Sequence, residues 1–205
     1  MIAVIDYSVG NIGSIANMLS KIGAEFVVTS DHEEIQSAHK ILLPGVGAFD
    51  EGVKRLNSTG LFELLNKLVL DEGRPVLGIC LGMQLLTRGS EEGELQGFGW
   101  VPADTIRFKF PDSENEPLNI PHMGWNKVKP TTGQGLYSGF DEELRFYFVH
   151  SYHVVCDNES DVSAKAFYGF DFHASIQKGH IYGAQFHPEK SHRFGMLLLK
   201  NFVEL

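Results

Sequence analysis

Apolar runs alternate with segments of helical periodicity along the first half of the chain. Four short runs are almost continuously apolar and are predicted strands, at residues 2–6, 25–29, 41–43 and 75–79. Helical spacing of apolar residues, or an acidic capping pattern, predicts helices between them, at 12–22, from 31 onward and at 61–70. Strands of this kind, separated by helices, are typical of a parallel sheet that is covered on both faces.

The second half of the chain has aromatic and β-branched runs in close succession. Predicted strands occupy residues 105–110, 126–128, 145–149, 152–156 and 162–167. The runs 175–177 and 181–185 are typical of a hairpin, the polar segment 111–121 predicts a mobile loop, and a last helix is predicted at 191–202. No repeat or linker interrupts the sequence. Residues 1–205 are therefore predicted to form a single α/β domain, a mostly parallel sheet with an antiparallel β-rich insertion.

Composition narrows the class of protein. Of the 205 residues, 43% are hydrophobic, which excludes intrinsic disorder. The formal net charge of −9 disfavours nucleic acid and anionic membranes as partners. No apolar run approaches the ~20 residues of a membrane span, and the first residues are typical of a strand rather than a secretion signal. The two cysteines form no metal-type pair, so we expect a reducing, cytoplasmic location.

Cys80 lies between a predicted strand and a predicted helix, with Gly78 and Gly82 two residues to either side. These glycines permit the sharp turn of a nucleophile elbow, with sulfur in place of oxygen. The helix N-terminus favours a thiolate, and the N–H group of Leu81 is well placed to stabilise an oxyanion. The alternative is a buried structural cysteine, the usual state of this residue type. Cys156 ends a β-branched run and is interpreted as a packing residue.

A thiolate nucleophile needs a base, and one of the nine histidines is the best candidate. His187 ends a predicted strand and precedes Pro188, which favours an extended chain. In an extended segment His187 and Glu189 point to the same side, so the carboxylate can accept the imidazole N–H. If residues 150–153 form a strand, His150 and His153, three residues apart, face opposite sides, which makes a poor dyad or metal chelate. Five others are expected at the surface: His32, His39, His173, His180 and His192.

Together these features resemble the class I glutamine amidotransferases. The resemblance rests on the elbow around Cys80, on the triplet from His187 to Glu189, and on a glycine-rich loop at 43–49. Two further motifs, at 121–126 and 146–152, narrow it to the glutaminase subunits of imidazole glycerol phosphate synthases. The resemblance runs from Asp6 to Asn201, over nearly the whole chain.

The resemblance implies a three-layer fold and a thioester mechanism. The thiolate of Cys80 would attack the side-chain amide carbon of L-glutamine, and His187 would protonate the departing ammonia. Water activated by His187 would then hydrolyse the thioester to glutamate, with Glu189 as third member of a catalytic triad. The oxyanion would be held by N–H groups of three residues: Leu81, Val46 and Gly47. No metal or organic cofactor is required.

Binding residues also follow from the resemblance. Gln84 lies one helical turn after Cys80 and is expected to contact the glutamine, as are the backbone groups of Ser151 and Tyr152. The ammonia acceptor would be a cyclase or synthase subunit in a heterodimer, and the stretch around Trp125 is a candidate contact with it: His122, Met123, Trp125 and Asn126. Core packing is an equal alternative for Trp125.

One departure from the family pattern bears on which enzyme accepts the ammonia. Members of the histidine pathway more often have small residues where His192 and Phe194 stand. This variant resembles paralogues that supply ammonia to amidotransferases of bacterial surface-sugar synthesis. A stand-alone γ-glutamyl hydrolase and a non-catalytic regulatory module are the alternatives from other classes.

Overall fold

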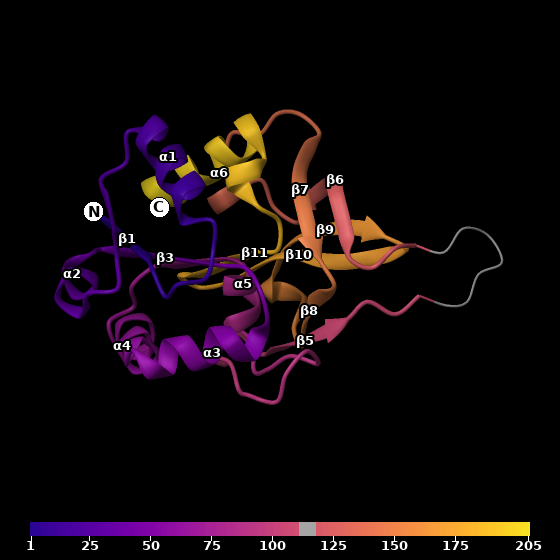
Figure 1. Cartoon of the computed structure of the whole chain (residues 1–205). Coiled ribbons are helices and arrows are strands. Elements are labelled where there is room, and N and C mark those ends of the chain that lie inside the picture. The colour runs from indigo at the N-terminus through magenta and orange to yellow at the C-terminus, as the bar shows by residue number, and fades with distance from the viewer. Residues whose placement is uncertain (111–117) are drawn as a thin grey trace.

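A mixed sheet of eleven strands runs through the computed structural model, which describes residues 1–110 and 118–205 (Figure 1). The strands are β1 (Ile2–Ile5), β2 (Phe26–Thr29), β3 (Lys40–Gly45), β4 (Val76–Cys80), β5 (Ala103–Arg107), β6 (His122–Pro130), β7 (Leu144–His150), β8 (Tyr152–Cys156), β9 (Val162–Tyr168), β10 (Phe170–Lys178) and β11 (Ile181–Ala184). The α-helices are α1 (Ile12–Ile22), α2 (His32–Ser37), α3 (Phe49–Ser58), α4 (Leu61–Asn66), α5 (Leu81–Leu85) and α6 (His192–Glu204).

Five strands form the parallel part of the sheet, in the order β2-β1-β3-β4-β11. The strands β1, β4 and β11 are buried along their whole length, as their uninterrupted apolar sequences predict. Figure 1 shows α1 and α6 on one face of this part and α3 and α4 on the other. The predicted parallel sheet with helices on both faces is confirmed.

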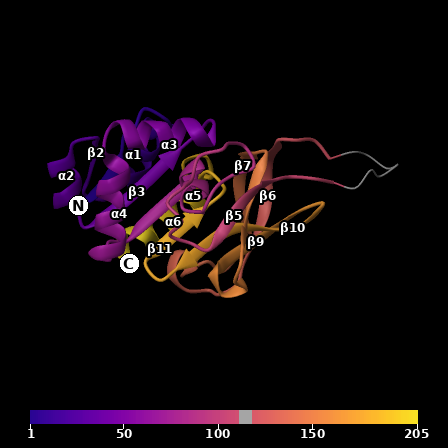
Figure 2. The same cartoon turned by 90° about the horizontal axis from the view of Figure 1, so that it is seen from below.

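The remaining strands are antiparallel and continue the same sheet. From β11 the order runs through β10, β9 and β6 to β7, while β8 pairs with both β5 and β10. Figure 2 shows these strands extending from the parallel part. The predicted insertion is therefore an extension of the central sheet, in which antiparallel pairs outnumber parallel ones. In the register of β6 and β7, His122 lies opposite His150.

Several elements differ from their sequence predictions. The helix α3 was not predicted, although Phe49, Val53 and Leu56 form a buried stripe at helical spacing. The helix predicted at 61–70 is α-helical only as far as Asn66, and residues Lys67–Asp71 form a π-helical segment that follows it directly. The strand predicted at 126–128 is the nine-residue β6, since pairing with β7 extends it. Of the predicted loop at 111–121, residues 111–117 lie outside the described residues.

Helix α2 begins where the acidic pattern predicts it. The side chain of Asp31 accepts hydrogen bonds from the N–H groups of Glu33 and Glu34 at 2.9 and 3.0 Å. Within the described residues, no helix is long and apolar enough to cross a membrane.

Candidate active site

Cys80 ends β4, and α5 begins at the next residue, so the predicted strand-to-helix turn is confirmed. The backbone of Cys80 has φ 55° and ψ −110°, a strained conformation of the kind found at functional sites. A Cβ atom on Gly82 would overlap the carbonyl oxygen of Leu43, and one on Gly78 would lie 2.6 Å from the carbonyl carbon of Gly82. Both glycines are therefore required because strand and helix pack closely at the elbow.

His187 and Glu189 form a buried pair. Their side chains are 1% and 2% exposed, and Nδ1 of His187 lies 2.8 Å from Oε1 of Glu189. The predicted contact is confirmed, but the predicted reason is wrong. Residues Pro188–Lys190 form a 3₁₀ turn, and this turn, rather than an extended chain, brings the carboxylate back to the ring.

The electrostatics of His187 depend on both of its acidic neighbours. Burial of the ring disfavours the imidazolium and is the largest single effect. Interactions with Cys80 and with Glu189 together outweigh it, so the pKa of His187 is raised above its usual value. The other ring nitrogen, Nε2, is buried and has no hydrogen-bond partner among the described residues. That nitrogen is thus available for a proton transfer.

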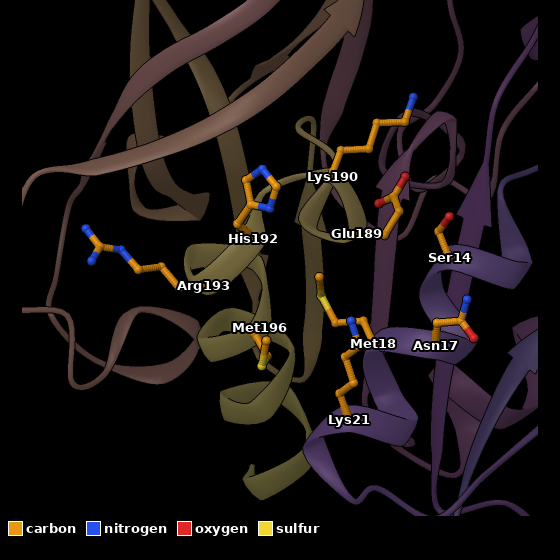
Figure 3. A pocket seen from close by; sticks show the side chains of 9 residues that line it. All are labelled: Ser14, Asn17, Met18, Lys21, Glu189, Lys190, His192, Arg193 and Met196. Carbon is orange, nitrogen blue, oxygen red and sulfur yellow. The ribbon is translucent and has the colours of Figure 1, made fainter.

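Glu189 borders a cavity of about 370 Å³ that lies between α1 and the start of α6 (Figure 3). Its Oε2 atom is buried and has no hydrogen-bond partner within the described part of the chain. Figure 3 shows Ser14 and Asn17 of α1 on one side of this cavity and Arg193 of α6 on the other. The carboxylate of the pair therefore lies between His187 and this cavity.

A pocket of about 460 Å³ opens above Cys80. It brings together the sequence-predicted oxyanion and substrate residues, which come from three separate parts of the chain. Its lining consists of Val46, Gly47, Ala48, Cys80, Leu81, Gln84, Glu92, Pro121, Val149, His150, Ser151 and Tyr152. Gly47 has φ 106°, a conformation that favours glycine, so the backbone of this loop can lie against the pocket.

Two polar residues at this site were not predicted. The carboxylate of Glu92 lines the pocket and accepts a hydrogen bond from the N–H of Phe49 at 2.9 Å. The fully buried amide of Gln185 donates to Sγ of Cys80 at 3.8 Å and accepts from Nε2 of Gln84 at 3.2 Å. A polar side chain at the end of the apolar strand β11 was the available indication for Gln185. Glu92 lies in a turn-rich acidic segment that shows no pattern.

The histidines outside the pair only partly follow their predictions. His32, His39 and His192 are exposed, as expected, whereas His173 and His180 are half-buried. His150 and His153 do not share one strand, because β7 ends at His150 and β8 begins at Tyr152. Both are buried. His150 instead forms a hydrogen bond of 2.9 Å with His122, which sequence spacing could not predict.

The candidate interface residues differ in exposure. Met123 is 62% exposed and Trp125 48%, so core packing is excluded for Trp125. The Trp125 ring is stacked on His192, with 5.5 Å between ring centroids and 8° between planes. Asn126 is half-buried, and His122 is buried at 4% exposure. His122 therefore lies beneath this surface and does not present its ring on it.

Two further features considered in the sequence are possible metal ligands and the second cysteine, Cys156. No group of three or more His, Cys, Asp or Glu side chains in this part of the chain is arranged to hold a metal ion. Cys156 is buried, and burial is the main reason why the pKa of its thiol is raised to about 12. A thiol with this pKa is neutral and inert at pH 7, in agreement with a packing role.

Comparisons with known proteins agree with this geometry. The family model described as "Glutamine amidotransferase class-I" matches residues 3–205. The "Imidazole glycerol phosphate synthase subunit HisH 2" of Methanococcus maripaludis is 50% identical, covering 100% of this chain and 99% of that protein. Its namesake in Pseudomonas aeruginosa is 47% identical, with both chains covered completely. A solved structure titled "Crystal structure of glutamine amidotransferase" has a TM-score of 0.74 at 17% identity, covering 100% of this chain and 98% of that one, and supports the fold.

Proposed function

Because the chain belongs to the class I glutamine amidotransferase family, we propose that it is the glutaminase subunit of an imidazole glycerol phosphate synthase. In this role it hydrolyses L-glutamine to glutamate and passes the ammonia to a separate synthase subunit, a step of histidine biosynthesis. The relatives that carry this subunit name match over the full length of the chain, which supports the assignment. The proposed location is the cytoplasm, where two free thiols remain reduced.

The proposed chemistry uses three side chains. The Cys80 thiolate attacks the amide carbon of glutamine, and the imidazolium of His187 gives its proton to the departing nitrogen. Ammonia leaves, and the γ-glutamyl thioester remains on sulfur. His187 then takes a proton from water, which attacks the thioester and releases glutamate. Glu189 fixes the tautomer and orientation of the imidazole through its 2.8 Å hydrogen bond. The observation that carries the proposal is geometric: Cys80 lies at a strained strand-to-helix turn below a pocket of about 460 Å³, and the buried pair of His187 and Glu189, 2.8 Å apart, lies beside it.

The pocket supplies the proposed binding groups. The N–H groups of Leu81 and of the loop at Val46 and Gly47 stabilise the oxyanion, where loss of one donor costs ~10²–10³ in rate. Gln84 and the backbone of Ser151 and Tyr152 hold the glutamine. Glu92 contributes the pocket's carboxylate, which is suited to the α-ammonium group of an amino acid.

The proposed docking surface consists of Met123, Trp125 and Asn126 on β6. Met123 and Trp125 are large, exposed and apolar, which is typical of residues that anchor a partner. Tyr147 of the neighbouring strand β7 contacts the Trp125 ring, and the Nζ atom of Lys190 lies 5.6 Å from the ring centroid of Tyr147. The partner is the synthase subunit of a heterodimer, and His122 acts from beneath this surface.

Replacement of the nucleophile tests the proposal. Cys80→Ala in the complex with the synthase subunit should abolish product formation from glutamine and preserve it with added ammonium salts. Cys156→Ala, which removes the other buried thiol, should leave both reactions intact. Equal loss of both reactions in Cys80→Ala would contradict the assignment. Strong glutamine turnover without a partner would favour a stand-alone hydrolase, and failure of a glutamine-like electrophile to label Cys80 would favour a regulatory module.

One observation favours a different ammonia acceptor as the partner of this chain. His192 stacks on Trp125 at the proposed docking surface, so a bulky ring occupies part of the area offered to the partner. This is compatible with a paralogue that serves an amidotransferase of surface-sugar synthesis. Activation assays with each candidate synthase subunit distinguish the two, because only the true partner should stimulate glutamine hydrolysis.

A further inference from the structure

A chain of hydrogen bonds runs from β6 through the interior to the glutamine pocket. The amide of Asn126 lies 3.2 Å from Nε2 of His122. Nδ1 of His122 lies 2.9 Å from Nε2 of His150. Nδ1 of His150 in turn lies 2.7 Å from the carbonyl oxygen of Tyr152. Asn126 is half-buried at the proposed docking surface, whereas Tyr152 lines the pocket above Cys80.

The contacts at both ends fix the direction of every bond. Oδ1 of Asn126 accepts from the N–H of Lys127 at 2.7 Å, and its Nδ2 donates to the carbonyl of Phe167 at 2.8 Å. The amide therefore presents an N–H to Nε2 of His122, which must be unprotonated. At the other end a carbonyl can only accept, so Nδ1 of His150 carries a proton. The two ends agree, since Nδ1 of His122 then donates to the unprotonated Nε2 of His150.

This arrangement requires two neutral rings, and the surroundings keep them neutral. Burial is the main cause that lowers the pKa of His122 to about 4 and that of His150 to about 3. Proton uptake by His150 would set its Nε2–H against the Nδ1–H of His122 at 2.9 Å, and proton uptake by His122 would set its Nε2–H against the amide N–H of Asn126 at 3.2 Å. The rings also pack tightly, with His122 stacked on Tyr168 at 4.1 Å between centroids.

The carbonyl of Tyr152 is the point where this chain meets the pocket. It also accepts from Nε2 of Gln84 at 3.5 Å, and Gln84 contacts the Gln185 amide that donates to Cys80. The position of this carbonyl therefore determines the position of Gln84 as well. Without the hydrogen bond from His150, this carbonyl would keep only the weaker 3.5 Å contact with Gln84, and the wall of the pocket would be less firmly held.

We propose that His122 and His150 are positioning residues for glutamine, which hold the Tyr152 carbonyl and with it Gln84 in the geometry that binds the substrate. The inference rests on the proposed glutaminase function. It assigns His122 an internal role in place of a direct contact with the partner. Neither histidine takes part in bond making or breaking.

The kinetic test compares two reagents for Cys80 in the full-length chain. A glutamine analogue, 6-diazo-5-oxo-L-norleucine, must occupy the pocket before it reacts, whereas iodoacetamide requires only the thiolate. In His122→Phe, which keeps a ring for packing, the half-saturating concentration of the analogue should rise about five- to tenfold. The rate with iodoacetamide should stay within twofold. His122→Gln, which offers both a donor and an acceptor, should restore part of the lost affinity.

His153→Phe is the matched control. His153 is buried beside the same Phe108 and Phe172 rings and takes no part in the chain of hydrogen bonds. An equal loss of affinity in His153→Phe, or none in His122→Phe, would overturn the proposal. Slower reaction with both reagents in His122→Phe would likewise overturn it, because the defect would then lie at the nucleophile.

A spectroscopic test is independent of glutamine. Imidazole ¹⁵N shifts at pH 7 should place the proton on Nδ1 in both His122 and His150. A proton on Nε2 of either ring would overturn the proposal whatever the activity of the chain. If the wild-type protein instead shows both Nδ1 protons but no saturable labelling by the analogue, the glutaminase assignment fails, while the series of hydrogen bonds from Asn126 to Tyr152 stands.

Discussion

Four buried histidines of this chain differ in charge because their neighbours differ. Burial lowers the pKa of His122 and His153 to about 4 and that of His150 to about 3. Burial acts in the same sense on His187, where Cys80 and Glu189 reverse its effect and raise the pKa. A histidine beside two acidic groups holds a proton for catalysis, whereas one among aromatic rings serves as a neutral hydrogen-bonding residue.

The neutral histidines predict how stability depends on pH. An unfolded histidine takes up a proton near pH 6.5, whereas folded His122 and His150 remain neutral down to about pH 4 and about pH 3. The unfolded chain therefore binds more protons in this range, and the free energy of unfolding falls as the pH drops below 6.5. Each such histidine contributes a slope of ~1.4 kcal/mol per pH unit. Folded His187, with its raised pKa, is already protonated there. It adds a slope of the opposite sign only near pH 6.5 and above, where the unfolded residue is still taking up its proton, and it does so equally in the variants compared.

Urea unfolding between pH 7 and pH 5 measures this slope. His122→Phe should flatten it by about one proton, that is by ~1.4 kcal/mol per pH unit. The exposed His39→Phe should leave the difference between pH 7 and pH 5 as it is in the wild type. Carboxylates contribute equally to all three proteins, so they cancel in the comparison. An unaltered slope in His122→Phe would show that this ring is not kept neutral by the fold.

Residues whose partners are near in sequence could be predicted, and the others could not. The glycines around Cys80, and Glu189 two residues after His187, form local motifs whose geometry follows from the backbone. The contact between His122 and His150 depends on the register of β6 against β7, which a slip of one residue would destroy. Gln185 was missed for the same reason, since its partners Gln84 and Cys80 lie about a hundred residues away.

The elbow depends on the close approach of β3 and α5, which pack with no side chain between them at Gly82. A Cβ atom on Gly82 would meet the backbone carbonyl oxygen of Leu43, which belongs to the sheet and has little freedom to move. Gly13 is also helical, but nothing lies within 4 Å of a Cβ atom at that position. Gly82 therefore has no room for a side chain, whereas Gly13 has room for one.

Alanine at each of these positions should have opposite effects. Gly82→Ala should lower the free energy of unfolding by ~3 kcal/mol or more, since β3 and α5 must separate. Gly13→Ala should leave stability unchanged or raise it by less than ~1 kcal/mol, because alanine is the better helix former. Thermal and urea unfolding of the two variants measure the difference. Tolerance of alanine at Gly82 would contradict the tight packing of the elbow.

Apart from α3, which was missed despite its helical spacing, the elements were predicted where apolar periodicity alone determines structure and not where pairing does. The parallel strands and α1 follow from their own sequences. The length of β6 follows from its partner β7, because alternate residues such as Met123, Trp125 and Lys127 are exposed and give no apolar run. The π-helical segment after Asn66 likewise has no counterpart in apolar spacing.

The parallel and antiparallel parts of the sheet contribute different parts of the site. The parallel part supplies Cys80 at a strand end, where ligands of parallel sheets generally bind. The antiparallel part supplies Tyr152 and His150 on one side of the pocket and the proposed docking surface on β6. Substrate binding and partner binding therefore share one set of strands, which allows the partner to influence the pocket through β6.

The proposed docking surface leads to a prediction about assembly. Trp125 is a large, half-exposed ring held in place by His192 and Tyr147, so little conformational freedom is lost when a partner covers it. Trp125→Ala should weaken the complex with the synthase subunit by at least ~30-fold, the effect of a ~2 kcal/mol anchor. Leu70→Ala removes another exposed apolar side chain, in the π-helical segment, and should leave affinity within twofold. Titration calorimetry gives both dissociation constants. Similar affinities for the two variants would place the interface elsewhere on the molecule, and the stacking of His192 on Trp125 would then have no bearing on the choice of acceptor.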